Sequence, residues 1–92
     1  MELENKGVHV EKSYLFGSYA KGEEHEFSDI DLALISKNFS GILHEDIKPF
    51  LDLLVKHYRI QPVTFHPKKL KEGGPLIEEI MKSGIVIDEG KK

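Results

Sequence analysis

Cysteine and tryptophan are absent from this 92-residue sequence, and no long apolar run occurs in it. Without cysteine, disulfide bonds and thiolate metal sites are excluded. No segment approaches the roughly 20 consecutive apolar residues that a membrane-spanning helix needs. The first residues also show no secretory signal pattern. We therefore expect a cytoplasmic protein that makes no use of a membrane.

An excess of basic residues is also missing, because 13 Lys and Arg stand against 16 Asp and Glu, a net charge of -3. A protein that binds nucleic acid without sequence preference needs such an excess for its phosphate contacts. The charge balance therefore disfavours nucleic acid as a partner. It does not disfavour a nucleotide enzyme, because bound divalent metal ions supply local positive charge.

The length of the chain predicts one domain, which we expect to span residues 1–92. A chain this short buries only a modest core. The first expected strand also begins close to the N-terminus, which would leave a packing groove on the sheet. Self-association into a homo-oligomer, or a partner protein, would then cover that groove.

The pattern of apolar residues predicts a mixed α/β domain, with helices packed on a small sheet. Strands are expected at residues 8–16, 28–36, 59–65 and 85–87. Pro62 inside the third strand indicates a sheet edge or a bulge. Short helices are expected at residues 1–7, 19–24, 67–70 and 75–82. The longest helix is expected at residues 44–58, with a buried stripe made of Ile47, Phe50, Leu51, Leu54 and Tyr58.

A glycine-serine turn follows the first expected strand, in the segment GSYAKG at residues 17–22. Gly17 allows the backbone to approach a ligand closely. The start of the next expected helix offers unpaired N–H groups, which attract anions. The hydroxyl of Ser18 can donate to a phosphate oxygen, and Lys21 adds a positive charge. The segment has the features of a phosphate-binding turn.

Two aspartates begin the second expected strand, in the segment SDIDL at residues 28–32. Asp29 and Asp31 lie two positions apart, so their carboxylates point to the same side of the strand. Paired carboxylates suit Mg²⁺, which completes its shell with water and substrate phosphates. A phosphate cradle beside a two-metal site indicates phosphoryl or nucleotidyl transfer. A lone Gly-Ser pair is usually only a turn, and a lone Asp-x-Asp is often a solvated strand end. The combination is what indicates function.

This combination, over residues 15–35, resembles the signature of the minimal nucleotidyltransferases, small members of the DNA polymerase beta superfamily. Residues 44–58 and 59–67 resemble the later part of the same family. The resemblance implies the α/β nucleotidyltransferase fold, a nucleoside triphosphate such as ATP as substrate, and Mg²⁺ in a two-metal site. It implies that Asp29 and Asp31 are catalytic metal ligands, and that Gly17, Ser18 and Lys21 bind the nucleotide.

The chain departs from the family at one position that bears on catalysis. Active relatives usually carry a third carboxylate on the following strand, where this sequence has Gln61. An amide oxygen can bind a metal weakly, but it cannot accept a proton as a carboxylate does. Three alternatives stay open: the activity is reduced, another carboxylate substitutes, or the chain binds nucleotide without turnover.

The resemblance also implies a partner, because many minimal nucleotidyltransferases occur with a small helical HEPN protein. Such an antitoxin transfers AMP to a tyrosine of the toxin. One alternative is a module that neutralises a toxin by contact alone. Another is an enzyme that modifies a small-molecule acceptor, although such enzymes usually have extra helical domains for the acceptor.

The remaining candidate side chains are expected to be structural. The five histidines show no metal-site spacing, and only His66, after the third strand, is expected near the cleft. The aromatic residues Tyr14, Phe16, Phe50 and Tyr58 are expected in the core rather than stacked on a base.

Overall fold

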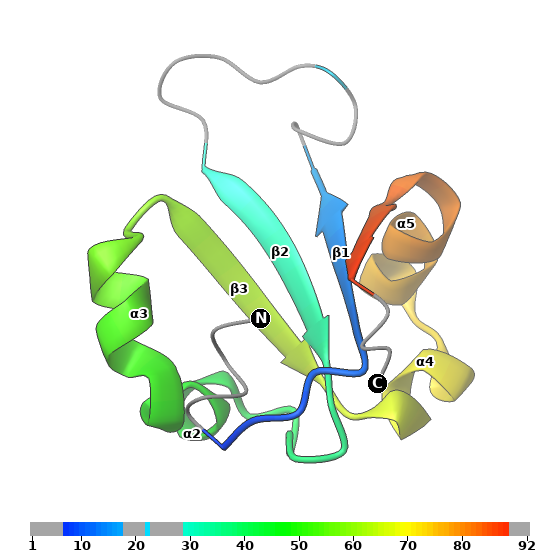
Figure 1. Ribbon diagram of the computed structural model, residues 1–92. Helices are drawn as coiled ribbons and strands as arrows, with labels where there is room; N and C mark the ends of the chain where they lie inside the picture. The colour runs from blue at the N-terminus through cyan, green and yellow to red at the C-terminus, as the bar shows by residue number, and fades with distance from the viewer. Residues whose placement is uncertain (1–6, 18–21, 23–28, 89–92) are drawn as a thin grey trace.

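Four strands form one mixed sheet in the computed structural model, which describes residues 7–17, 22 and 29–88. These strands are β1 (Lys12–Phe16), β2 (Ile30–Ile35), β3 (Ile60–Phe65) and β4 (Ile85–Asp88), arranged in the order β3-β2-β1-β4 (Figure 1). Strand β1 is antiparallel to both β2 and β4, whereas β2 and β3 are parallel. The expected α/β class is confirmed, and β3 is an edge strand, as Pro62 indicates.

Helical segments connect the strands on two sides of this sheet. Between β2 and β3 lie α2 (Leu43–Asp46), the 3-10 turn η2 (Lys48–Phe50) and α3 (Leu51–Lys56). Between β3 and β4 lie α4 (Pro67–Glu72) and α5 (Pro75–Ser83). In Figure 1, α2 and α3 lie on the β3 side of the view, and α4 and α5 on the other. Within the described part of the chain, no helix is long and apolar enough to cross a membrane.

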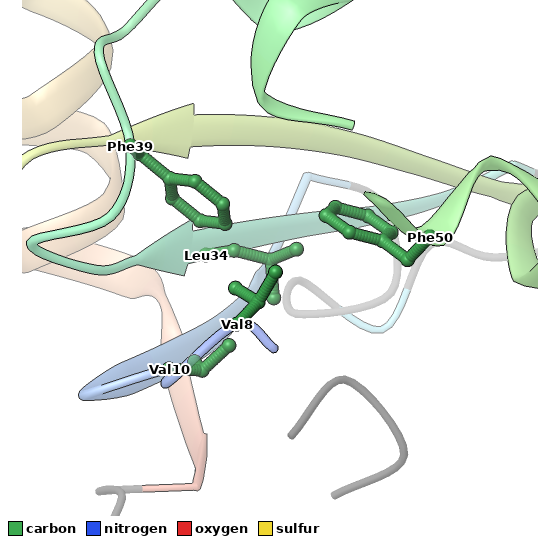
Figure 2. Close-up of a cluster of buried hydrophobic side chains, with 5 residues drawn as sticks. All are labelled: Val8, Val10, Leu34, Phe39 and Phe50. Carbon is green, nitrogen blue, oxygen red and sulfur yellow. The ribbon is translucent and has the colours of Figure 1, made fainter. Parts of the chain in front are cut away.

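The sheet carries a separate apolar cluster on each face. One cluster, drawn in Figure 2, consists of Val8, Val10, Leu34, Phe39 and Phe50, with Ile47, Leu53 and Leu54 packed against it. The other consists of Tyr14, Phe16, Ala33, Ile35 and Ile80, with Val63, Phe65 and Leu70 around it. We call these sides the α3 face and the α5 face. Because side chains alternate along a strand, Asp31 points to the α5 face, together with Ala33 and Ile35.

The long helix expected at residues 44–58 is broken into α2, η2 and α3. Pro49 lies inside η2 and has no N–H for a helical hydrogen bond, so α3 starts in a new rotational register. Phe50 is buried as expected. The same prediction is wrong for Leu51 and Tyr58, which are 50% and 77% exposed. The buried stripe predicted for one continuous helix therefore does not extend across this interruption.

The other elements agree with the sequence pattern to within a few residues. The first strand starts at Lys12 rather than at residue 8, although Val8 and Val10 are buried. The two later helices end at Glu72 and Ser83, slightly beyond their predicted limits. The helices expected at residues 1–7 and 19–24 fall largely outside the described residues.

A buried carboxylate connects α2 to the sheet. Asp46 accepts hydrogen bonds from the backbone N–H of Ser40 at 2.8 Å, the Ser40 hydroxyl at 2.9 Å, the Gly41 N–H at 2.9 Å and the Thr64 hydroxyl at 2.8 Å. Burial opposes ionisation of this group. The hydrogen bonds from Ser40, Thr64 and Gly41 outweigh burial and hold the pKa of Asp46 below its ordinary value. The carboxylate therefore holds the loop before α2 against β3.

Candidate active site

Three strand ends meet at one end of the sheet. Because β1 runs against β2, and β3 runs with β2, the end of β1 lies beside the starts of β2 and β3 (Figure 1, upper end of the sheet). Phe16 pairs with Asp31, and Asp31 pairs with Gln61. The structure thus brings Gly17, Asp31 and Gln61 together, although they are far apart in sequence.

Gly17 packs directly against the carboxylate of Asp31. Its φ is +74°, in the left-handed region that favours glycine. A Cβ atom at this position would also overlap the Oδ2 atom of Asp31. Two independent constraints therefore require glycine here, and the crowding by Asp31 is a reason for glycine that the sequence pattern does not predict.

Negative charge accumulates around Asp31, which is half-buried, while Asp29 is exposed just before β2. Burial is the largest factor that raises the pKa of Asp31 above its ordinary value, and the charges of Asp29 and Glu79 raise it further. Glu79 is half-buried on α5, on the same face of the sheet. Sequence spacing gave no sign of Glu79, since only the packing of α5 brings it near β2.

The residues present fit a divalent cation. The charge of Asp29 makes ionisation of Asp31 less favourable, so a positive ion between the two carboxylates would stabilise them, and carboxylate oxygens are the ligands that Mg²⁺ prefers. Among residues 7–17, 22 and 29–88, no group of three His, Cys, Asp or Glu side chains could hold a metal. An ion here would therefore take its other ligands from water, from substrate phosphates or from the amide of Gln61.

Two predicted site residues are not among those that the structure describes, and a third lies elsewhere. Ser18 and Lys21 lie outside the described residues. The prediction that His66 lies near the cleft is wrong, because β3 carries the chain from Gln61 to the opposite end, where Phe65 pairs with Ile35. There His66 caps α4, and its Nδ1 atom accepts a hydrogen bond from the Lys68 N–H at 3.1 Å.

A pocket of about 290 Å³ lies beside the site on the β3 side. It is lined by Ile30, Lys56, His57, Tyr58, Arg59 and Ile60. Ile30 lies between Asp29 and Asp31 in the chain, but side chains alternate along a strand, so Ile30 points to the α3 face and Asp31 to the α5 face. Sequence reasoning missed this pocket because it assigned Tyr58 to the core.

Comparison with known proteins finds a family and a relative that match this chain. The family profile described as "Polymerase beta, Nucleotidyltransferase" matches residues 2–92. A protein of Methanocaldococcus jannaschii, named as a proposed protein adenylyltransferase, is 39% identical over 70 residues. That match covers 68% of this chain and 48% of the relative. The chain therefore spans about half the length of the curated relative that it resembles.

Two solved structures share the architecture. One, described as a toxin-antitoxin with AMP-PNP, has a TM-score of 0.62 at 21% identity. The other, described as a mutant of the toxin-antitoxin MntA-HpeT with two aspartates two positions apart each replaced by glutamate, has a TM-score of 0.58 at 16% identity. Each covers 91% of this chain, which spans 64% of the matched chain. At such identities the likeness shows the fold.

Proposed function

The chain belongs to the polymerase beta nucleotidyltransferase family, and from this premise we propose that it transfers AMP from ATP to a hydroxyl group, with Mg²⁺ at the site. The observation that carries the proposal is the convergence of Gly17 with the Asp29 and Asp31 pair at one end of the sheet. The acceptor oxygen forms a bond to the α-phosphorus, the bond from that phosphorus to pyrophosphate breaks, and the acceptor proton passes to water.

Each residue has a definite role in this proposal. Asp29 and Asp31 hold Mg²⁺, which when bound neutralises phosphate charge and activates the acceptor oxygen. The backbone of Gly17, the hydroxyl of Ser18 and the charge of Lys21 bind the β- and γ-phosphates. Burial around Asp31 lowers the local dielectric, which strengthens these charge interactions.

We further propose that the acceptor is a tyrosine of a helical HEPN-type toxin, so that the protein acts as an antitoxin. Support comes from the relative named for protein adenylylation and from the two toxin-antitoxin structures. The aspartates replaced in the second structure have the same spacing as Asp29 and Asp31. The AMP-PNP in the first is the kind of nucleotide that this site would bind.

A second candidate function is neutralisation of the toxin by contact alone. The observation that favours it is Gln61, which is exposed and pairs with Asp31 on the strand where the family resemblance implies a third carboxylate. An amide cannot act as the general base for the acceptor hydroxyl. The two functions differ in whether AMP is transferred.

The deciding experiment compares the wild type with an Asp29→Asn, Asp31→Asn double variant. Calorimetry measures ATP binding with Mg²⁺, and radiolabelled ATP measures AMP transfer to a purified HEPN-type toxin. A Glu45→Gln, Glu72→Gln variant is the matched control, because it also removes two carboxylates, both exposed and on other elements. We expect binding and transfer to disappear only in the aspartate variant.

The other results of that experiment are equally informative. Binding without transfer would contradict the proposed enzyme and favour contact-only neutralisation. Equal ATP binding by wild type and aspartate variant would contradict the site itself.

Substitution of Gln61 tests the missing carboxylate directly. Gln61→Glu keeps the size of the side chain and adds a group that can accept the acceptor proton. General-base catalysis typically contributes about 10²–10⁴-fold, so we expect the transfer rate to rise by at least about tenfold. Gln61→Ala is the control and is expected to leave the rate within about threefold. A Gln61→Glu rate no higher than that of the wild type would contradict this role for position 61.

A further inference from the structure

Glu79 is a half-buried carboxylate on α5 that has no role in the proposed function so far. Its neighbour Ile80 is buried in one cluster with Ala33, and Ala33 is the next residue after Asp31 on the α5 face of β2. Strand β4, which follows α5, begins beside Leu15, so α5 ends at the same end of the sheet as Asp31. Two separate features of the fold therefore place Glu79 near the carboxylate pair.

The Glu79 carboxylate has no compensating positive charge in the part of the chain that the structure describes. Lys82 lies three positions further along α5, but there the two side chains form no ion pair. The hydrogen bond that Glu79 makes with the Ser83 hydroxyl, at 3.0 Å, uses the backbone carbonyl of Glu79. A half-buried charge without a partner is costly, and the charge of Glu79 also makes ionisation of Asp31 less favourable. A cation between these carboxylates would relieve both costs.

Space for water lies beside Glu79. A cavity of about 600 Å³ is lined by Pro75, Glu78, Glu79, Lys82 and Ser83. Carboxylate, ammonium and hydroxyl groups give it the polar partners that ordered water needs. Across residues 7–17, 22 and 29–88, no three His, Cys, Asp or Glu side chains could hold one ion directly. Contact between Glu79 and an ion at the aspartate pair would therefore pass through water.

We propose that Glu79 accepts hydrogen bonds from water bound to the divalent cation that Asp29 and Asp31 hold. Because this ion is the one in the proposed function, the role of Glu79 depends on that function. Mg²⁺ usually keeps several water ligands in proteins, and each bound water has protons to donate. Carboxylates that accept from metal ligands orient them and strengthen metal binding. Glu79 thus supplies a third negative charge from α5, at a site where β3 carries the neutral Gln61.

Binding of Mn²⁺ alone tests this role without ATP or an acceptor. Mn²⁺ prefers the same oxygen ligands as Mg²⁺, and electron paramagnetic resonance measures its free concentration. Glu79→Gln keeps the size of the side chain and removes its charge, so we expect Mn²⁺ binding to weaken about tenfold. Glu79→Asp keeps the charge and should recover part of this loss. Glu78→Gln is the matched control, because Glu78 lines the same cavity but is exposed and is not among the charges that act on Asp31. It should bind Mn²⁺ as the wild type does.

A purely structural role for Glu79 predicts different results in two further measurements. Under the proposal, the Tm of Glu79→Gln in EDTA should be no lower than that of the wild type, because an unpaired charge has been removed. Its ATP binding should be weak at low Mg²⁺ and approach the wild type at saturating Mg²⁺, because the defect lies in affinity for the ion. A lower Tm in EDTA, with a loss of ATP binding that excess Mg²⁺ does not restore, would contradict the proposal.

Failure of the proposed function looks different from failure of this role for Glu79. If the wild type and the Asp29→Asn, Asp31→Asn variant bind Mn²⁺ equally, the proposed metal site itself is wrong. If the aspartate variant loses Mn²⁺ binding while Glu79→Gln binds Mn²⁺ as tightly as the Glu78→Gln control, only the role of Glu79 is wrong.

Discussion

Gly17 is the residue on which the geometry of the site depends most directly. It must adopt a positive φ and must also lack the Cβ atom that would displace Asp31. Gly73, at the end of α4, shares the first constraint with a φ of +80°, but no atom lies within 4 Å of the position of its Cβ. Substitution of Gly73 therefore introduces backbone strain alone, whereas substitution of Gly17 introduces backbone strain and also crowds the Asp31 carboxylate.

Alanine at each position tests this distinction. A left-handed backbone costs a residue with a Cβ about 1–2 kcal/mol, and each 1 kcal/mol lowers the Tm of a domain this size by roughly 4–8 °C. Gly17→Ala and Gly73→Ala should both lower Tm in thermal unfolding. Only Gly17→Ala should also abolish Mg²⁺-dependent ATP binding in calorimetry, because Asp31 must move. Wild-type ATP affinity in Gly17→Ala would show that the contact with Asp31 has no functional importance.

Ionised Asp31 is expected to lower the stability of the fold, although the proposed metal site requires it. Its pKa is raised in the folded state, so its ionisation destabilises the fold as pH rises through that folded-state pKa. Asp31→Asn removes this cost. In metal-free buffer near pH 7, we expect its Tm to exceed that of the wild type by about 2–4 °C. The difference should vanish below the ordinary Asp pKa of 3.8, where both proteins are neutral at this position. A variant less stable than wild type at neutral pH would contradict this account.

Local spacing predicts that the carboxylates of Asp29 and Asp31 lie close together, and in the structure the charge of Asp29 raises the pKa of Asp31. Asp29 itself lies just before β2, which begins at Ile30. Glu79 and Tyr58 were missed because their positions depend on tertiary packing, of α5 on β1 and of the turn after α3. His66 was misplaced because local pattern does not give the direction of β3 relative to the site.

At the scale of elements, strands were predicted better than helices. Each strand combines β-branched or aromatic residues with nearby turn signals, which act over a few residues. The helix over residues 44–58 was wrongly predicted as continuous. Its apolar residues recur at helical spacing throughout, but Pro49 interrupts the helix. In the interrupted segment, Leu51 lies on the surface rather than in the expected buried stripe.

Asp46 makes the segment between β2 and β3 sensitive to pH. Its folded-state pKa is lowered, so its contribution to stability is complete above the ordinary Asp pKa of 3.8 and is lost as pH falls through the lower folded-state value. Asp46→Asn cannot match the charged acceptor, and it should cost about 1–3 kcal/mol at neutral pH. Urea unfolding of the wild type and of Asp46→Asn at neutral and acid pH measures this loss of unfolding free energy. The loss should be smaller at acid pH.

The matched control for Asp46 is its neighbour Glu45. Its side chain is 51% exposed and lies 3.3 Å from the Nζ atom of Lys48. Exposed pairs of this kind contribute roughly 0–1 kcal/mol, so Glu45→Gln should change stability little. Equal effects of the two substitutions would mean that the buried hydrogen bonds of Asp46 are unimportant.

At the scale of the whole molecule, the site depends on strand order, which no local pattern determines. Only the pairing of β2 with both β1 and β3 brings Gly17, Asp31 and Gln61 together. Ligand that binds the assembled site must therefore stabilise the entire fold. At free ATP of about 100 times Kd, with Mg²⁺, the expected gain is about 2.7 kcal/mol.

Thermal unfolding with increasing ATP checks that gain. Tm should rise with ATP concentration in the presence of Mg²⁺ and stay nearly constant with EDTA. The Asp29→Asn, Asp31→Asn variant should show no rise in either buffer. A rise in the wild type that is the same with EDTA would exclude a role for the metal in binding.

The position of β1 between β2 and β4 has a consequence for the stage of folding at which the protein becomes able to bind nucleotide. Tyr14 pairs with Ala33 on one side and with Val86 on the other, so β1 needs both an early and a late part of the chain. Contacts between distant segments form slowly because loop closure must precede them. Nucleotide-binding capacity should therefore emerge only in the last stage of folding, and a nascent chain without β4 should be unable to retain ATP.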